Sequence, residues 1–313
     1  MEKYCPDALW HLAQPLLPLH SERHQGNGRS CSDDRAALAA IRFVLESGAR
    51  GASRLPRSWC TWAQHAEVRG DLPQPTVAGQ TVDGLVLDID ATIVICHSDK
   101  ESATRTWKKT FGFHPLLCFL DNTGEALAGL LREGRAGSNT TTDHITVLDQ
   151  ALAQIPDAQR HGTPILLRSD SAGSSHGFLA HIRGLRDRHL DIRFSVGAAI
   201  TEPVRAAIRA VTGWIPAIDT DGDLREHAEV CEITGLLDAA GWPEGTRFLA
   251  RRERPHPGAQ LSLFDTIEGW RHQIVATDTP PGNGSIQHLE ARHRAYARVE
   301  SYSSNADYGL KST

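Results

Sequence analysis

Residues 85–92 read LVLDIDAT, and the predicted architecture can be built outward from this stretch in both directions. It is a nearly continuous apolar run, which is typical of a strand that is buried on both faces. Asp88 and Asp90 are two residues apart, so on a strand both carboxylates point to the same face. A buried strand that ends in paired acids predicts a polar site at that end of a sheet.

Downstream of this strand the apolar pattern predicts further strands that alternate with helices. Residues 113–120 and 125–131 form a predicted hairpin, because the turn signal DNTG at 121–124 separates them. The remaining predicted elements are a helix at 143–154, a strand at 164–168, a helix at 177–185 and a strand at 191–196. By analogy, this order is the layout of a ribonuclease-H-like fold. We therefore predict an α/β protein with a mixed sheet flanked by helices.

Further segments surround this core. Residues 197–280 contain short strand-like runs at 214–218, 230–237, 246–252, 259–264 and 272–277, which predicts a β-rich insertion. Ser285 can cap a helix over roughly 286–301, which would complete the core. Residues 1–57 are predicted to form a short helical N-terminal segment, and the stretch at 58–82, rich in Gly, Pro and Ser, a junction. The predicted divisions are 1–57, 58–82, 83–196, 197–280 and 281–313.

Composition narrows the class of protein. Of 313 residues, 40% are hydrophobic and 23% are charged, as in an ordinary globular protein. There is no apolar run of membrane-spanning length and no secretory signal, so we expect a cytoplasmic protein. The six cysteines include no C-x-x-C pair, which argues against a zinc knuckle. The net charge of −5 does not by itself indicate a nucleic-acid binder, although arginines cluster locally.

Acids at three places in the chain are spaced as metal-dependent strand cleavage on this fold requires. Asp88 and Asp90 lie at the end of the first predicted strand, Asp170 follows the strand at 164–168, and Glu300 lies on the last predicted helix. Helical periodicity places residues 289, 293, 296 and 300 on one side of that helix. Carboxylates are the ligands that Mg²⁺ prefers, and a pair of cations roughly 3.5–4 Å apart needs several of them. Each acid alone is more often a turn, cap or solvated residue, so the prediction depends on the set.

Five stretches downstream of residue 83 carry a family resemblance. In order they are DIDATIVICHSDKE, FGFHPLLCFLDNTGEALAGLLREGRAGSNT, RSDSAGSSHGFLAHI, RRERPHPGAQL and LEARHRAYARVE. Together they strongly resemble one group of DDE transposases of bacterial insertion sequences. The resemblance covers about 83–300 without large gaps and is highly specific.

The resemblance implies a DNA transposase whose catalytic residues and metal ligands are Asp90, Asp170 and Glu300. It implies two Mg²⁺ ions, for which Mn²⁺ would substitute, hydrolysis of a strand at the element end, and attack of the freed 3′-hydroxyl on target DNA. The implied partners are the terminal inverted repeats, target DNA and a second copy of the chain in a synaptic homodimer, with no membrane, in the cytoplasm and near the nucleoid. The implied phosphate contacts are Arg251, Arg252, Arg254 and Arg298.

Two departures from the family pattern bear on activity. Residues 6–57 resemble the N-terminal region of a different transposase group, which predicts a chimeric chain. After Glu300 the family usually continues with a charged helix and a further domain. Residues 301–313 hold no Lys in the expected register two turns beyond that Glu, which predicts a truncated C-terminus. Both departures leave open whether this copy is a competent transposase.

Two alternatives compete with this reading. LVLDIDAT also fits a haloacid-dehalogenase-like phosphatase, with Asp88 as nucleophile and Asp90 as acid and base. That fold has a helix soon after the first strand, whereas the sequence of this chain predicts a pair of strands there. The second alternative is a transposase remnant that binds DNA but does not cut it.

Overall fold

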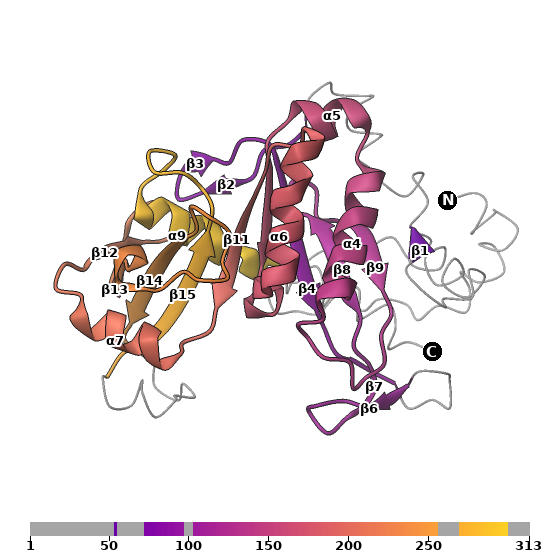
Figure 1. Ribbon diagram of the computed structural model, residues 1–313, viewed down its shortest axis with the longest axis horizontal. Helices are drawn as coiled ribbons and strands as arrows, with labels where there is room; N and C mark the ends of the chain where they lie inside the picture. The colour runs from indigo at the N-terminus through magenta and orange to yellow at the C-terminus, as the bar shows by residue number, and fades with distance from the viewer. Residues whose placement is uncertain (1–52, 55–71, 97–102, 256–268, 300–313) are drawn as a thin grey trace, which may run out of the picture.

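A computed structural model of the chain describes residues 53–54, 72–96, 103–255 and 269–299. Four predictions lie largely or wholly outside these residues: the N-terminal segment at 1–57, most of the junction at 58–82, the strand-like run at 259–264, and Glu300. The described residues form one large mixed sheet with helices against it, and two small sheets (Figure 1). None of their helices combines the length and the hydrophobicity that a membrane span requires.

The large sheet has ten strands in the order β1–β9–β8–β4–β10–β11–β15–β14–β13–β12. Their bounds are β1 Ser53–Arg54, β4 Leu85–Ala91, β8 Leu116–Leu120, β9 Glu125–Leu130, β10 Ile165–Ser169, β11 Ile192–Ala198, β12 Ile215–Ile218, β13 Leu224–Glu232, β14 Arg247–Glu253 and β15 Arg271–Thr277. The small sheets join β2 (Thr76–Val77) to β3 (Gln80–Thr81), and β5 (Val94–Ile95) and β6 (Thr104–Arg105) to β7 (Phe111–Phe113).

The helices lie mainly between the core strands in sequence. They are α4 Thr141–Gln154, α5 Asp157–Gly162, α6 His176–Gly184, α7 Glu202–Ala210 and α9 Ile286–Arg294, with the 3₁₀ helices η3 Ser171–Ser174, η4 Leu185–Arg188, η5 Thr234–Leu236 and η6 Ala295–Ala297. Ser285 caps α9, as predicted, by accepting a hydrogen bond from the backbone N–H of His288 at 3.1 Å.

The strands β9, β8, β4, β10 and β11 have the topology of the predicted fold. β4 pairs antiparallel with β8, Leu87 lying opposite Leu120, and β8 pairs antiparallel with β9. β4 pairs parallel with β10, so that Ile89 lies opposite Ser169, and β10 pairs parallel with β11. A meander followed by two parallel strands, with crossover helices between them, is the ribonuclease-H-like arrangement. The prediction of this fold class is confirmed.

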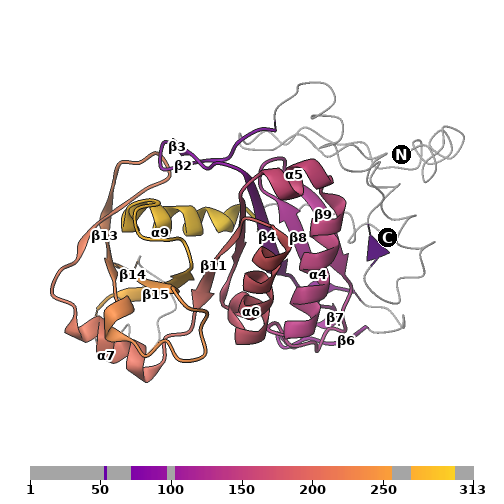
Figure 2. The ribbon, with the colours of Figure 1, turned by 45° about the horizontal axis from the view of Figure 1, so that its top comes forward.

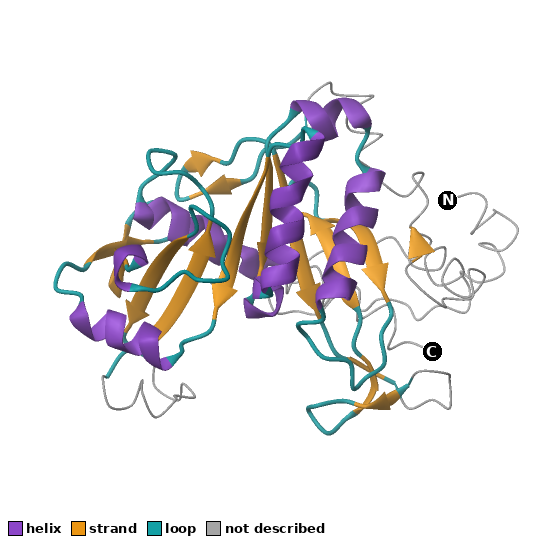
Figure 3. Ribbon diagram, in the orientation of Figure 1, coloured by secondary structure: helices purple, strands orange, loops and turns teal. Residues whose placement is uncertain are grey.

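Both faces of the core sheet are covered, which explains why β4 is apolar apart from Asp88 and Asp90 (Figures 2 and 3). Leu87 and Ile89 point to the face on which α4 and α6 pack through residues such as Leu148 and Phe178. Residues of the other parity, such as Val86, belong to a second cluster with α9 and η6. Burial of each large apolar side chain contributes about 1.5–3 kcal/mol. Asp88 and Asp90 have the parity of Val86 and therefore face α9 and η6.

The β-rich segment after β11 continues the core sheet. β15 pairs antiparallel with β11, Ser195 lying opposite Thr277, and β14, β13 and β12 follow outward. The sequence pattern located β12, β14 and β15 closely. It placed one strand at 230–237, whereas β13 spans Leu224–Glu232 and gives way to η5, because its mostly polar first half carries no apolar signal.

Two other elements differ from the sequence prediction. The single strand expected at 113–120 is divided into β7 and β8 around Pro115, because proline has no N–H to donate to a ladder. The short helix α5 was not predicted, since none of its residues is buried and it therefore has no apolar periodicity.

Candidate active site

Asp90 and Asp170 lie beside each other at one edge of the core sheet. β4 and β10 are neighbouring parallel strands, and Ile89 and Ser169, the residues just before the two acids, are paired in register. Asp170 is also the N-cap of η3, where its Oδ1 accepts a hydrogen bond from the N–H of Ala172 at 2.8 Å. The two acids that the sequence analysis singled out are thus brought together from positions far apart in the chain.

The surroundings of Asp170 disfavour its negative charge. Burial raises the pKa of Asp170, the N–H of Ala172 opposes this change, and the charge of Asp90 raises the pKa further. Like charges held close together in a partly desolvated place repel each other. A bound cation would relieve that repulsion, so the two carboxylates fit the oxygen chemistry that Mg²⁺ prefers.

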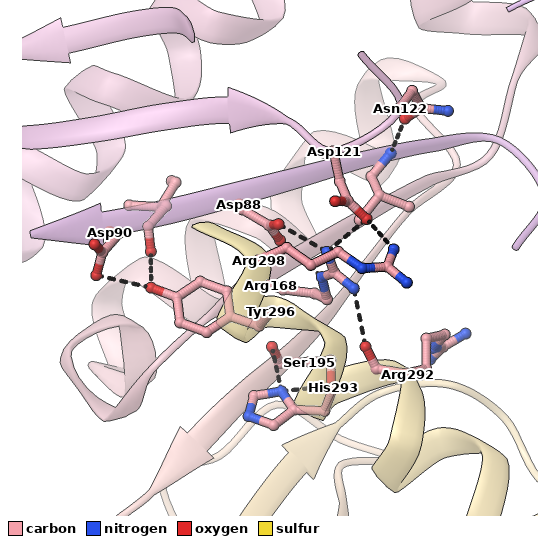
Figure 4. A network of polar contacts seen from close by, with 12 residues as sticks. Asp88, Asp90, Asp121, Asn122, Arg168, Ser195, Arg292, His293, Tyr296 and Arg298 are labelled. Carbon is pink, nitrogen blue, oxygen red and sulfur yellow. Dashed lines mark hydrogen bonds and ion pairs between the residues drawn. The ribbon is translucent and has the colours of Figure 1, made fainter. Parts of the chain in front are cut away.

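Tyr296 reaches this pair from η6. Its hydroxyl donates to Asp90 Oδ1 at 3.0 Å and to the carbonyl oxygen of Ile89 at 2.8 Å, a three-centre arrangement of one proton (Figure 4). Burial, followed by the charges of Asp90, Asp170 and Asp88, holds the pKa of Tyr296 well above its ordinary value. The phenol therefore stays protonated and acts as a donor that fixes one oxygen of Asp90.

A network of charges lies next to the two acids, and Figure 4 shows its members gathered around Arg168. Arg168 on β10 donates to both carboxylate oxygens of Asp88 at 2.7 Å, pairs with Asp121 at 2.9 Å, and donates to the carbonyl oxygen of Arg292 at 3.0 Å. Asp121 also pairs with Arg298 at 3.3 Å. We call Asp88, Arg168, Asp121 and Arg298 the core charge network.

Asp88 has a structural role, because it belongs to the core charge network. Burial raises the pKa of Asp88 to about 6, against the opposing charge of Arg168. Both oxygens of Asp88 are occupied by the guanidinium, and the side chain is fully buried. A phosphatase nucleophile must reach its substrate. The topology disagrees as well, because β4 is followed by an antiparallel hairpin strand. The phosphatase alternative is therefore wrong.

The third acid of the predicted set cannot be placed, because Glu300 lies outside the described residues. Among the described residues there is no group of three or more His, Cys, Asp or Glu side chains that could hold a metal ion. The helix that leads to Glu300 does point toward the site: Leu289 is buried, and His293 and Tyr296 line the side that faces the core sheet.

Comparison with known proteins identifies the family to which the chain belongs. The family model described as "Transposase DDE domain group 1" matches residues 48–303. The chain belongs to this family. The match includes Asp90, Asp170 and Glu300, and it begins before the predicted junction at 58–82.

Other comparisons are sparser. No curated protein matches the chain. One similar solved structure is the cryo-EM structure of the piggyBac transposase synaptic complex with hairpin DNA, at 10% sequence identity and a TM-score of 0.40. The likeness covers 74% of this chain and 41% of the solved chain, so this chain spans well under half of that protein's length.

The arginines predicted to contact phosphates have different surroundings in this DDE family member. Arg251 is buried and pairs with Glu253 and Glu290, so its charge is compensated inside the protein. Arg252 and Arg254 are more accessible and lie on the outer half of the sheet. Their contact with phosphate, and that of Arg298 in the core charge network, stays a prediction; burial argues against it for Arg251.

The sequence analysis missed Arg168, Asp121 and Tyr296. Arg168 and Asp121 carried no distinctive pattern, because a charged residue on a strand or in a turn is usually solvated. Tyr296 did have a signal, since helical periodicity places it on the same side as Glu300. A tyrosine one turn before a metal-binding acid could have been proposed as its neighbour.

Proposed function

We propose that this chain is a DNA transposase of a bacterial insertion sequence that cuts and joins DNA strands with Asp90, Asp170 and Glu300. The observation that carries the proposal is the convergence of Asp90 and Asp170 at the paired ends of β4 and β10. Membership in the DDE transposase family supports the same chemistry. The core charge network and Tyr296 support it further, because they hold β4, β10 and the last helix in one arrangement.

We assign the metal to these same acids. Two Mg²⁺ ions, or Mn²⁺ in their place, would activate the attacking oxygen and stabilise the leaving oxygen of the scissile phosphate. The chain's own part is to hold its carboxylates rigidly: Asp170 is fixed by the N–H of Ala172, and Asp90 by the hydroxyl of Tyr296. A requirement for divalent cations is consistent with this family. The raised pKa of Asp170 also supports a cation site, because a bound cation would stabilise the carboxylate.

Glu300 is proposed as the third ligand from its place in sequence. Tyr296 contacts Asp90 directly, and Glu300 follows it by about one helical turn. The family match extends to residue 303 and so includes it.

The proposed partners follow from this activity. They are the terminal inverted repeats of the element, target DNA and a second copy of the chain in a synaptic homodimer, within the cytoplasm and close to the nucleoid. The N-terminal segment is proposed to be chimeric, because residues 6–57 resemble a different transposase group. A remnant that binds DNA without cutting it is the competing outcome of the test below.

The decisive experiment is nicking of supercoiled plasmid by the purified full chain with Mg²⁺ or Mn²⁺. Asp90→Asn, Asp170→Asn and Glu300→Gln should each reduce nicking to background while circular dichroism shows a folded protein. Asp187→Asn, on the exposed surface, is the matched control and should nick normally. A folded wild-type chain that never nicks, or an Asp170→Asn variant that nicks normally, would contradict the proposal.

A further inference from the structure

A small three-stranded sheet projects from the core next to the proposed active site. It consists of β5, β6 and β7, with β7 in the middle, and we call it the arm. β6 and β7 form a hairpin in which Arg105 lies opposite Phe111. The turn of this hairpin carries Trp107, Lys108 and Lys109 at its tip.

The tip of the arm has an unusual composition for a surface. Trp107 is 68% exposed, and Lys108 lies with its Nζ 5.1 Å from the centre of the indole ring. Lys109 and Arg105 are exposed as well. Large aromatic side chains are normally buried, because exposure of their apolar area to water is unfavourable. An exposed tryptophan among cations therefore indicates a binding surface.

The arm is built to hold this tip in place. Thr106 and Thr110 close the turn with a backbone hydrogen bond at 2.8 Å and contact each other through their hydroxyls at 2.6 Å. Lys109 adopts a left-handed conformation with φ of 64°, and its N–H donates to the carbonyl oxygen of Thr106 at 3.0 Å. A side chain at Gly112 would lie 2.0 Å from the carbonyl oxygen of Val94, so the strands approach very closely there.

The arm also lies at the end of the sheet that carries the acids. β5 begins just after Asp90, and Thr92 donates a backbone hydrogen bond to Pro115, between β7 and β8, at 3.2 Å. Ala91, the last residue of β4, is paired with Leu116, the first residue of β8. In Figure 1 the arm extends from the sheet at the end where β4 stops. The tip is thus connected to the Asp90 end of β4 by short, hydrogen-bonded segments.

The charge of the β6–β7 hairpin, which carries the tip of the arm, contrasts with that of the whole chain. The chain has a formal net charge of −5, yet residues 103–113 hold three cations and no acid. Those cations are Arg105, Lys108 and Lys109. A local basic surface on an acidic protein attracts polyanions to that place and not elsewhere. The free-energy gain comes from phosphates that release their counterions.

We propose that the arm binds DNA with unpaired bases at the strand end that is presented to Asp90 and Asp170. One base stacks on Trp107, and the adjacent phosphates contact Lys108 and Lys109. This inference rests on the proposed function, and it adds a DNA-binding surface distinct from the arginines of β14. An exposed aromatic ring flanked by cations is the combination that single-stranded nucleic acid prefers, because every base has a face to stack and every nucleotide carries a phosphate.

A second copy of the chain is the competing occupant of this surface. The tip of the arm, residues 103–113, carries three cations and no acid, so two tips that met would repel each other. Charge complementarity therefore favours DNA over self-association.

The test measures DNA binding by the purified full chain in EDTA, where no cutting occurs. The probes are fluorescein-labelled oligothymidylate and a fluorescein-labelled duplex of random sequence, followed by fluorescence anisotropy. Trp107→Ala should weaken binding to oligothymidylate by about 5- to 100-fold, the usual range for loss of one stacked base, and affect the duplex less. Trp107→Phe keeps an aromatic ring and should retain most of the affinity.

The lysines are tested by the salt dependence of binding. The double variant Lys108→Gln/Lys109→Gln should flatten the slope of log Kd against log salt by about 1.4, because each lost phosphate contact on a single strand removes about 0.7. Two control variants lie on other exposed surfaces, Leu224→Ala for the loss of apolar area and Arg188→Gln for the loss of charge. Both should bind oligothymidylate like the wild type.

The outcomes separate this proposal from the proposed function. Wild-type DNA binding by Trp107→Ala and by the double lysine variant, together with loss of nicking in Asp170→Asn, overturns the arm proposal and leaves the proposed transposase function intact. Loss of a dimer in Trp107→Ala by analytical ultracentrifugation, with unchanged DNA binding, overturns it in favour of a protein interface. A wild-type chain that neither binds DNA nor nicks plasmid overturns both.

Discussion

In the core half of the sheet Arg168 is fully buried between Asp88 and Asp121, whereas in the outer half Arg252 is half-buried between two tryptophans. The guanidinium of Arg252 lies 4.3 Å from the ring centre of Trp214 and 4.6 Å from that of Trp270. Arg252 also donates to Glu229 at 2.6 Å. Both arginines are on strands and both are paired with acids, yet the solvent around them differs completely.

The difference in solvent exposure indicates which charges the stability of the fold depends on. Removal of Arg168 would leave Asp88 without its cation in a dry interior and Asp121 with Arg298 as its remaining cation, and an uncompensated charge in the interior is very unfavourable. Removal of Arg252 would leave Glu229 accessible to water, which screens and solvates it. Burial, and not the number of contacts, therefore decides how much each arginine matters to folding.

The largest expected effect is that of Arg168→Met. The free energy of unfolding should fall by about 3–5 kcal/mol, because Asp88 and Asp121 lose their shared cation in the interior. Urea denaturation followed by circular dichroism measures it. Arg188→Gln, at an exposed position, should change stability by no more than about 0.5 kcal/mol. Equal stability of the two variants would show that the core charge network contributes nothing.

A paired measurement sharpens this result. Asp88→Asn should also destabilise the protein, and in combination with Arg168→Met the two effects should be far from additive, since both residues belong to one network. Asp90→Asn lies on the same strand and should change stability little, because Asn can still accept the hydrogen bond from Tyr296. Similar losses of stability in Asp88→Asn and Asp90→Asn would contradict the different roles given to the two acids.

A smaller effect is expected from pH through His293. Burial, followed by the charge of Arg168, lowers the pKa of His293 to about 3. The unfolded chain binds a proton at this histidine below about pH 6.5, while the folded chain does not. Stability should therefore be fully present above pH 6.5 and fall as the pH drops, by up to about 2 kcal/mol at pH 5.

The contribution of His293 is isolated by comparison of variants. His293→Gln should show a weaker loss of stability between pH 7 and pH 5 than the wild type, because glutamine takes up no proton. His161→Gln, at an exposed position, should follow the wild-type curve. Thermal unfolding at several pH values measures all three chains, and parallel curves for wild type and His293→Gln would refute the expectation.

The smallest effect belongs to the outer half of the sheet. Arg252→Leu should lower the free energy of unfolding by about 1–2 kcal/mol, the sum of two partly exposed cation–π contacts and one solvated ion pair. Arg254→Leu loses the contact with Trp270 at 4.1 Å and an exposed hydrogen bond to the carbonyl oxygen of Gly269 at 3.0 Å, and should cost about half as much. If Arg252→Leu lowered the free energy of unfolding as much as Arg168→Met, burial would not explain the difference between the two halves of the sheet.

Sequence alone found the order of the core elements and the positions of Asp90 and Asp170. Apolar runs, the DNTG turn and helical periodicity are local signals, so the strands β4 and β10 and the helices α4 and α6 could be located from them. The sequence also favoured a transposase over a phosphatase for the LVLDIDAT stretch, since a phosphatase of that class has a helix where this chain has a hairpin. The third acid, Glu300, stays a prediction.

Only the tertiary structure decided which of the two neighbouring aspartates is structural. Asp88 and Asp90 are of one residue type, on one strand and one face, so no local rule separates them. Their roles diverge because Arg168 comes to Asp88 from β10 and Tyr296 comes to Asp90 from η6. Long-range pairing of this kind depends on how distant segments pack, and the energetics of a charge depend on the solvent that packing excludes.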